Sequence, residues 1–182
     1  MPLNVIGGLA AGIALKSPPR GVRPTAAIVR RSLFDSLGEL VVGAHALDLY
    51  AGAGSLGLEA LSRGARSCDF VERDRACAAV VRANLAAINR SGPFLGRVHC
   101  APVEKWLERH RARLSRYGLV LADPPYGESS LEVALAILAE ALDGAALVVV
   151  EHSSRAAVPH GAMRVARTLR HGDSALTILA PG

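Results

Sequence analysis

The sequence predicts an α/β fold with a doubly wound, mostly parallel sheet and a C-terminal antiparallel hairpin. Between residues 44 and 150, apolar runs alternate strictly with helical stretches, which is typical of a parallel sheet with helices on both faces. A glycine-rich turn lies between the first run and the helix that follows it, as in nucleotide-binding α/β units. The last two apolar runs flank His171-Gly172-Asp173, a turn signal that predicts the hairpin.

At the N-terminus, two short extended segments flank a turn that is rich in glycine and alanine. They cover residues 3–6 and 13–15, and they end at Ser17-Pro18-Pro19. This pattern predicts a small N-terminal β-hairpin extension with a linker over residues 1–19, followed by one domain over residues 20–182.

After Pro24, apolar residues recur at helical spacing and predict an amphipathic helix, with Thr25 available as its N-cap and Gly38 as its stop. The rest of the domain follows the alternating pattern. The predicted strands cover residues 44–50, 67–72, 96–100, 119–122 and 145–150, and the hairpin strands cover residues 163–169 and 175–180. The predicted helices between them cover residues 56–63, 75–89, 103–114 and 131–142.

The composition is that of a globular protein. The chain has 182 residues, of which 51% are hydrophobic and 20% charged, and this balance excludes a disordered or fibrous protein. Its three cysteines are an odd number and form no CxxC pair, so we expect a reducing cytosol and a cytoplasmic location. His99, His110 and His152 have no paired ligands in the sequence, and we expect no metal site.

The sequence predicts neither a membrane span nor secretion. The most apolar window, residues 131–150, is interrupted by Glu132, Glu140 and Asp143, and charges at membrane depth are costly. The apolar stretch near the N-terminus has no lysine or arginine ahead of it, unlike a signal peptide. We therefore expect no membrane partner.

The formal net charge of +5 comes almost entirely from arginine, and it favours a polyanionic partner. Three basic stretches predict a charged surface and could line one face of the molecule. Their arginines are Arg20, Arg23, Arg30 and Arg31; Arg109, Arg111, Arg113 and Arg116; and Arg155, Arg164, Arg167 and Arg170.

A GxGxxG pattern spans Gly52 to Gly57, between a predicted strand and a predicted helix. Glycines at such a turn let the backbone approach a ligand closely, and the next strand ends in Glu72, whose carboxylate could take a ribose diol. This pattern fits any adenosine cofactor, and NAD stays open at this point. The alternative is a glycine turn that serves only helix packing.

The sequence Asp123-Pro124-Pro125-Tyr126 follows the fourth predicted strand, so it lies at the same edge of the sheet as the glycine-rich turn. Two prolines hold a rigid extended turn that presents the Asp123 carboxylate and the Pro124 carbonyl as acceptors, with the Tyr126 ring beside them. This set suits an exocyclic amine on a flat base. Hydride transfer to a nicotinamide needs no such set, and the remaining alternative is a loop whose aspartate caps a helix.

With these motifs the chain resembles the S-adenosylmethionine-dependent methyltransferases of the class I, Rossmann-like fold. Within them it is similar to the RsmD-like 16S ribosomal RNA guanine-N2 methyltransferases. The likeness runs through nearly the whole chain and includes Val5-Ile6-Gly7-Gly8, Arg23-Pro24-Thr25, Val29-Arg30, Leu33-Phe34 and residues 47–54, 57–65 and 123–126. The Arg-Pro-Thr segment and residues 57–65 are more specific to this family than the class motifs are.

The resemblance implies a role for each matching residue. Asp48, Gly52 and Gly54 would hold the methionine end of S-adenosylmethionine, and Glu72 would hold its ribose. The catalytic segment that receives the target base would be Asp123, Pro124, Pro125 and Tyr126. Substrate RNA would be contacted by Arg23, Thr25 and Arg30.

Two features depart from the family pattern. The turn of the N-terminal hairpin, residues 9–13, lacks the basic residues that family members usually carry, which weakens RNA contact there. Pro102 stands where a family aspartate often lies near the adenine, and Val103 follows it. We therefore expect Val103 to contribute to adenine binding by apolar packing.

The resulting prediction is an enzyme that methylates the exocyclic N2 amine of a guanine in 16S ribosomal RNA, acting as a monomer. Whether the substrate is naked RNA or the assembled small subunit stays open. The alternatives are a DNA adenine or protein-glutamine N-methyltransferase, because the Asp-Pro-Pro-Tyr sequence suits planar amines generally. A dinucleotide-dependent oxidoreductase and a non-catalytic RNA-binding module are more distant alternatives.

Overall fold

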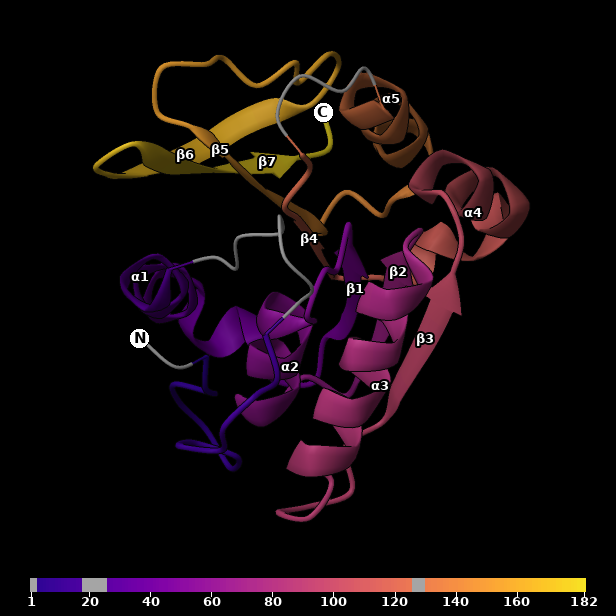
Figure 1. Cartoon of the computed structure of the whole chain (residues 1–182). Helices are drawn as coiled ribbons and strands as arrows, with labels where there is room; N and C mark the ends of the chain where they lie inside the picture. Colours follow the sequence, from indigo (N-terminus) through magenta and orange to yellow (C-terminus); the bar gives the residue numbers. More distant parts are fainter. Residues whose placement is uncertain (1–2, 18–25, 126–129) are drawn as a thin grey trace.

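The computed structural model of the chain describes residues 3–17, 26–125 and 130–182. Within this part, a single sheet has the strand order β3-β2-β1-β4-β5-β7-β6 (Figure 1). The strands are β1 (His45–Leu49), β2 (Ser67–Glu72), β3 (Gly96–Cys100), β4 (Leu119–Ala122), β5 (Leu147–Ser153), β6 (Arg164–His171) and β7 (Ser174–Ala180). Strands β1 to β5 are parallel, whereas β7 is antiparallel to both β5 and β6. The predicted fold class is confirmed.

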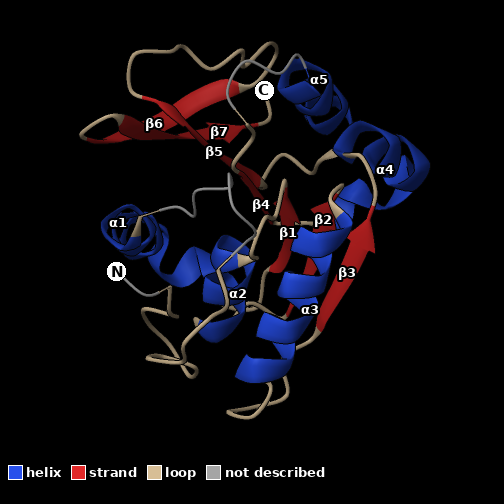
Figure 2. Ribbon diagram, viewed as in Figure 1, coloured by secondary structure: helices blue, strands red, loops and turns tan. Residues whose placement is uncertain are grey.

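Helices cover both faces of the sheet (Figure 2). They are α1 (Ala27–Leu37), α2 (Ser55–Ser62), α3 (Arg75–Ile88), α4 (Val103–His110) and α5 (Ser130–Ala141), with the 3₁₀ turns η1 (Gly38–Val41) and η2 (Arg111–Arg116). One core joins α1, α2 and α3 to the sheet, and the other joins α4 and α5 to it. None of the helices in the described ranges is long and apolar enough to cross a membrane.

The alternation of side chains along β1 assigns its residues to the two cores. Ala46 belongs to the core under α1 to α3, whereas Leu47 and Leu49 belong to the core under α4 and α5. Because successive strand residues point to opposite faces, Asp48 lies on the α2 side, where it accepts a hydrogen bond from Gly57. The chain therefore carries a polar group from the centre of the sheet toward the start of α2.

The predicted elements differ from the observed ones mainly at their ends. The predicted helix over residues 103–114 is α4 up to His110 and the tighter turn η2 beyond it. Strand β5 begins at Leu147 and continues to Ser153, because β7 pairs with its last residues. Helix α1 has Ala26 as its N-cap, and Thr25 lies outside the described residues; Gly38 ends α1 with φ 51°, as predicted.

The N-terminal hairpin is present in a minimal form. Its arms are joined by the N–H of Val5 to Ile13 O, at 3.0 Å, and by the N–H of Leu15 to Leu3 O, at 2.8 Å. Leu3, Val5, Ala10 and Leu15 are buried in the same core as α1, α2 and α3. The segment of residues 3–17 therefore packs as part of the main core.

At the other end of the chain, β6 and β7 form the predicted antiparallel hairpin. Its turn contains Gly172 with φ 59°. Strand β6 lies at the edge of the sheet, most of its residues are exposed, and its register with β7 shifts between Val165 and Arg167. The hairpin extends the parallel sheet on the side of β5.

Candidate active site

The candidate site lies where β1 and β4 end. These two strands are neighbours, with Leu49 beside Ala122, and the strand order reverses between them. Strand β2 pairs with β1 on its other side and ends at Glu72. In open α/β sheets, ligands bind at the carboxyl ends of the strands where the order reverses. The topology thus brings together the three sequence motifs that follow β1, β2 and β4.

The glycine-rich loop after β1 needs its glycines for steric reasons. Gly54 has φ 79° and is the N-cap of α2, and a Cβ there would lie 3.0 Å from Val81 Cγ1. A Cβ on Gly57 would overlap the Phe70 ring and would lie 2.7 Å from Cys68 Sγ. A side chain at Gly57 would push α2 away from the sheet, and one at Gly54 would press the loop against α3, so the two glycines allow the start of α2 to pack closely on both.

Tyr50 begins this loop in the left-handed region, with φ 58°. A non-glycine residue held there carries strain of about 1–3 kcal/mol, and such strain clusters at functional sites. The Tyr50 hydroxyl lies 3.2 Å from Ser130 Oγ at the start of α5. Sequence reasoning did not single out Tyr50, because a backbone angle of this kind leaves no signal in residue type.

Asp48 lies directly behind the loop and is 2% exposed. Its Oδ2 accepts the backbone N–H of Gly57 at 2.9 Å. Burial raises the pKa of Asp48 well above its usual range. The nearby carboxylates of Asp123 and Glu72 raise this pKa further, whereas the hydrogen bond from Gly57 lowers it. The charges of Asp123 and Glu72 thus act on Asp48 at this edge, and a cationic group bound there would favour the ionised form of Asp48.

Glu72 holds the glycine-rich loop from the side of β2. Its Oε2 accepts the N–H of Gly52 and its Oε1 accepts the N–H of Asp74, both at 2.8 Å. A carboxylate has about four acceptor sites, so these two bonds leave capacity for a ligand diol. The predicted contact of Glu72 with a ribose stays a prediction, whereas its contact with the loop is a structural fact that the sequence did not indicate.

The segment after β4 begins with Asp123 and Pro124, both half-buried, and continues to an exposed Pro125. Tyr126, the fourth predicted catalytic residue, lies outside the described residues. Val103, the predicted adenine contact, begins α4 and is buried in the core under α4 and α5. Because α4 follows the carboxyl end of β3, Val103 lies at the same edge of the sheet as the glycine-rich loop.

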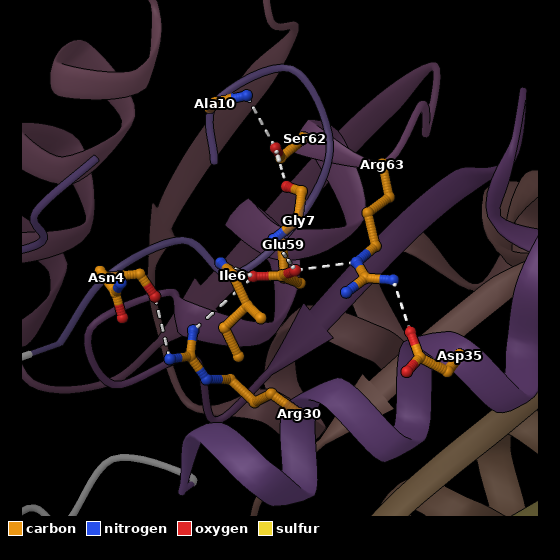
Figure 3. Close-up of polar contacts among 9 residues, drawn as sticks. All are labelled: Asn4, Ile6, Gly7, Ala10, Arg30, Asp35, Glu59, Ser62 and Arg63. Atoms are coloured by element: carbon orange, nitrogen blue, oxygen red, sulfur yellow. Dashed lines mark hydrogen bonds and ion pairs between the residues drawn. The ribbon is translucent and has the colours of Figure 1, made fainter. Parts of the chain in front are cut away.

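The predicted contact of Arg30 with RNA is wrong. Arg30 is 1% exposed, its Nη2 donates to Asn4 O at 2.9 Å, and its Nη1 lies 3.9 Å from Glu59 Oε2 (Figure 3). Burial lowers its pKa, and Glu59 and Glu151 oppose that shift. A guanidinium enclosed in this way cannot reach a phosphate. The other two predicted RNA contacts, Arg23 and Thr25, lie outside the described residues.

The three basic stretches do not line one face. Arg109 and Arg113 lie at the end of α4 and in η2, which lead into the amino end of β4, opposite Asp123. Arg155 follows the carboxyl end of β5, and Arg170 donates to Ser154 O at 3.1 Å. Both of these arginines are exposed at the same edge of the sheet as Asp123. Of these four arginines, only Arg155 and Arg170 lie at the edge that carries the candidate site.

Beneath α4, Asp69 accepts hydrogen bonds from His99 at 2.8 Å and from the Tyr117 hydroxyl at 2.7 Å. Trp106 is buried against these rings and packs in the core under α4 and α5. Among the residues that the structure describes, no group of three or more His, Cys, Asp or Glu side chains is placed to hold a metal ion.

The family model described as conserved hypothetical protein 95 matches residues 3–180, which is nearly the whole chain. The chain belongs to this family. Ribosomal RNA small subunit methyltransferase D from Escherichia coli (strain K12) is 34% identical over 160 residues, which is 86% of this chain and 78% of that protein. The protein of the same name from Haemophilus influenzae is 32% identical over 139 residues, or 76% and 71% of the two chains.

The solved structures agree with the family assignment. A structure of a protein from Escherichia coli that is named as a methyltransferase, yhhF, superposes with a TM-score of 0.81 at 32% identity. The superposition covers 100% of this chain and 98% of that one. An rRNA methyltransferase, aviRa from Streptomyces viridochromogenes, has a TM-score of 0.69 at 20% identity, which shows the shared fold.

Proposed function

We propose that this protein transfers a methyl group from S-adenosylmethionine to the exocyclic N2 amine of a guanine in 16S ribosomal RNA. One observation carries the proposal. The glycine-rich loop and the Asp123-Pro124-Pro125 segment meet at one edge of the sheet, in a chain 34% identical to a protein named ribosomal RNA small subunit methyltransferase D. We further propose that it acts in the cytoplasm as a monomer, on free RNA or on the assembled small subunit.

The charge of the site supports a cationic cofactor. S-adenosylmethionine carries a sulfonium and an ammonium group, and when bound it supplies an electrophilic methyl group. Asp48 and Glu72 would face its methionine end and its ribose, while Gly52 and Gly54 leave room for it beside the backbone. The raised pKa of Asp48 fits this assignment, because a bound cation would offset both the burial of the Asp48 carboxylate and its repulsion by Asp123 and Glu72.

The segment after β4 suits the target amine. The lone pair of an exocyclic amine is delocalised into the base, so the nitrogen must be oriented before it can attack. The Asp123 carboxylate and the Pro124 carbonyl accept its two N–H bonds, and the prolines fix both acceptors in space. Catalysis then comes mainly from positioning, with the target base out of its stack.

Substrate RNA would approach over the edge of the sheet that carries Asp123. Arg155 is 86% exposed there, and Arg170 lies beside it in the β6–β7 hairpin. Guanidinium groups bind phosphate in bidentate geometry and release counterions as they do so. Arg23 and Thr25 stay predicted RNA contacts on the basis of the sequence.

Methyl transfer to ribosomal RNA from a strain that lacks this protein tests the proposal. Purified protein with S-adenosylmethionine labelled in the methyl group is expected to label the small-subunit RNA at one guanine, and nuclease digestion identifies N2-methylguanine. Naked RNA and isolated 30S particles are compared to define the substrate. If DNA adenine or protein glutamine is labelled instead, the proposed substrate is wrong. If the protein binds NAD and does not bind S-adenosylmethionine, the proposed enzyme class is wrong.

A further inference from the structure

A single buried amide joins the N-terminal segment to the glycine-rich loop. Asn84, on α3, is 1% exposed. Its Oδ1 accepts the N–H of Lys16 at 2.7 Å, and its Nδ2 donates to Lys16 O and to Ala53 O, both at 3.0 Å. Lys16 lies next to the last residue of the described N-terminal segment, residues 3–17, and Ala53 lies between Gly52 and Gly54. Both donor hydrogens of Asn84 are therefore used, one on each of the two segments.

The same face of α3 also supports the loop by packing. Val81 lies one helical turn before Asn84, and its Cγ1 would be 3.0 Å from a Cβ on Gly54. Asn84 thus fixes the Ala53 carbonyl while Val81 fills the space beneath Gly54. Since a carbonyl that loses a buried donor must find another partner, the orientation of the Ala53 peptide depends on the Asn84 amide.

The N-terminal segment is held a second time, by the helix that follows the loop. Glu59 on α2 accepts the N–H of Ile6 and the N–H of Gly7, both at 2.8 Å. Ser62, one turn later, accepts the N–H of Ala10 at 2.9 Å and donates to Gly7 O (Figure 3). The N-terminal segment is therefore connected to the glycine-rich loop in two ways. One connection runs through α2, which follows the loop, and the other runs through Asn84 on α3.

We propose that Asn84 is a positioning residue that couples docking of the N-terminal segment to cofactor binding at the glycine-rich loop. This inference rests on the proposed function, because it takes the loop to bind S-adenosylmethionine. A ligand that orders the loop strengthens the hold of Asn84 on Lys16, and by thermodynamic reciprocity the docked segment strengthens ligand binding by the same factor. The N-terminal segment then contributes to cofactor binding through the loop that Asn84 holds.

The substitution Asn84→Asp isolates the two donor bonds. A carboxylate still accepts the Lys16 N–H but cannot donate to the carbonyls of Lys16 and Ala53 when ionised. Calorimetry is expected to show about ten-fold weaker binding of S-adenosylhomocysteine, the demethylated cofactor, as for the loss of one or two buried hydrogen bonds. Turnover at saturating S-adenosylmethionine is expected to stay within about two-fold, since Asn84 positions the cofactor and not the reacting amine.

Asn89→Asp is the matched control, because it makes the same chemical change at the end of the same helix. Asn89 is exposed, and its Oδ1 accepts the N–H of Phe94 at 3.1 Å, which an aspartate also does. This variant is expected to bind S-adenosylhomocysteine like the wild type. Equal affinity of the Asn84→Asp and Asn89→Asp proteins would overturn the inference, whereas a wild-type protein that binds no S-adenosylhomocysteine would overturn the proposed function instead.

Hydrogen exchange in the wild-type protein tests the coupling without any variant. Saturating S-adenosylhomocysteine is expected to slow exchange of the Lys16 amide by about ten-fold, the same coupling factor. The Phe94 amide donates to Asn89 and has no contact with the loop or the N-terminal segment through Asn84, so it is expected to exchange at an unchanged rate. Unchanged exchange at Lys16 in the saturated protein would show that the loop and the N-terminal segment are not coupled.

Discussion

The glycine-rich loop and the Asp123 segment lie at the same edge of the sheet, yet they are held there by different means. Buried polar groups from other elements fix the loop, including Glu72 on β2 and Asn84 on α3. The segment of residues 123–125 continues β4, and its two prolines restrict its backbone covalently. The loop therefore depends on the whole fold, whereas the segment carries much of its shape in its own residues.

This difference matches the two ligands that we propose. A small cofactor is the same molecule in every cycle, and a loop assembled by the core offers it one fixed shape. A base of a large RNA must be brought in from outside, and a stiff, half-buried segment at the strand end presents acceptors to it without reorganising the core. Substitutions in the loop are accordingly expected to change stability and cofactor affinity, whereas substitutions in the Asp123 segment are expected to change turnover.

The largest effect is expected for Asp123→Ala. Turnover should fall by at least about 100-fold, because the target amine loses a fixed acceptor, while affinity for S-adenosylhomocysteine stays within a few-fold. Methyl incorporation and calorimetry measure the two quantities. Asp173→Ala is the control, since Asp173 is an exposed carboxylate at the same edge, in the β6–β7 turn. A collapse of cofactor affinity would place Asp123 with the cofactor half of the site.

Gly57→Ala should act in the opposite way, through the fold. The added methyl group would overlap Phe70 and press on Asp48, so the free energy of unfolding should fall by roughly 1–3 kcal/mol and cofactor binding should weaken with it. Urea denaturation measures the change. Gly118→Ala is the control, because a Cβ there would lie 4.0 Å from Ala44 Cβ, which is an ordinary packing distance. Equal stability of the two variants would mean that the packing of α2 on the sheet tolerates more than its geometry indicates.

Asp48→Asn should separate stability from binding within the loop itself. The raised pKa of Asp48 means that folding favours its protonated form. The free energy of unfolding therefore falls as the pH rises from the ordinary aspartate pKa to the raised pKa, and it stays at the lower value above that range. A neutral amide can still accept the Gly57 N–H, so above that range the variant should melt at a higher temperature than the wild type while binding S-adenosylmethionine more weakly. Thermal melts from pH 4 to pH 9 give the profile; a variant that melts lower at every pH would refute this reading of Asp48.

The smallest effect is expected for Arg155→Ala. If Arg155 contacts a phosphate, the plot of log affinity for RNA against log salt should become shallower by about 0.7 to 0.9, with the methylated product unchanged. Filter binding across a salt series measures the slope. Arg109→Ala is the control, because Arg109 lies at the opposite edge of the sheet. An equal change of slope in both variants would mean that RNA covers both edges.

Sequence reasoning located the elements well where they depend on apolar periodicity. Strands β2, β3 and β4 have the predicted bounds. The clearest case is β4, a run of four buried apolar residues, which is typical of a parallel strand covered on both faces. The place of the site also followed from topology, since motifs that come after β1, β2 and β4 must meet at one edge.

Residues whose role depends on distant partners could not be assigned in this way. Arg30 belongs to a basic stretch, and only the fold shows that Glu59 and Asn4, 29 and 26 positions away, enclose its guanidinium. Asn84 is one polar residue in an alanine-rich helix, yet it bonds to Lys16 and Ala53, which are 68 and 31 positions away. Both are buried polar groups whose partners lie on other elements, and local patterns do not encode such pairs.

Strand β6 has a further consequence for the protein in solution. Exposed strand edges offer unpaired backbone groups to other chains and so promote aggregation. On β6, the exposed arginines Arg164, Arg167 and Arg170 and the shift of register after Val165 counter this tendency through charge repulsion and a local bend. Arg170, which adds positive charge at the edge of the candidate site, therefore also helps to keep copies of the chain from pairing edge to edge at high concentration.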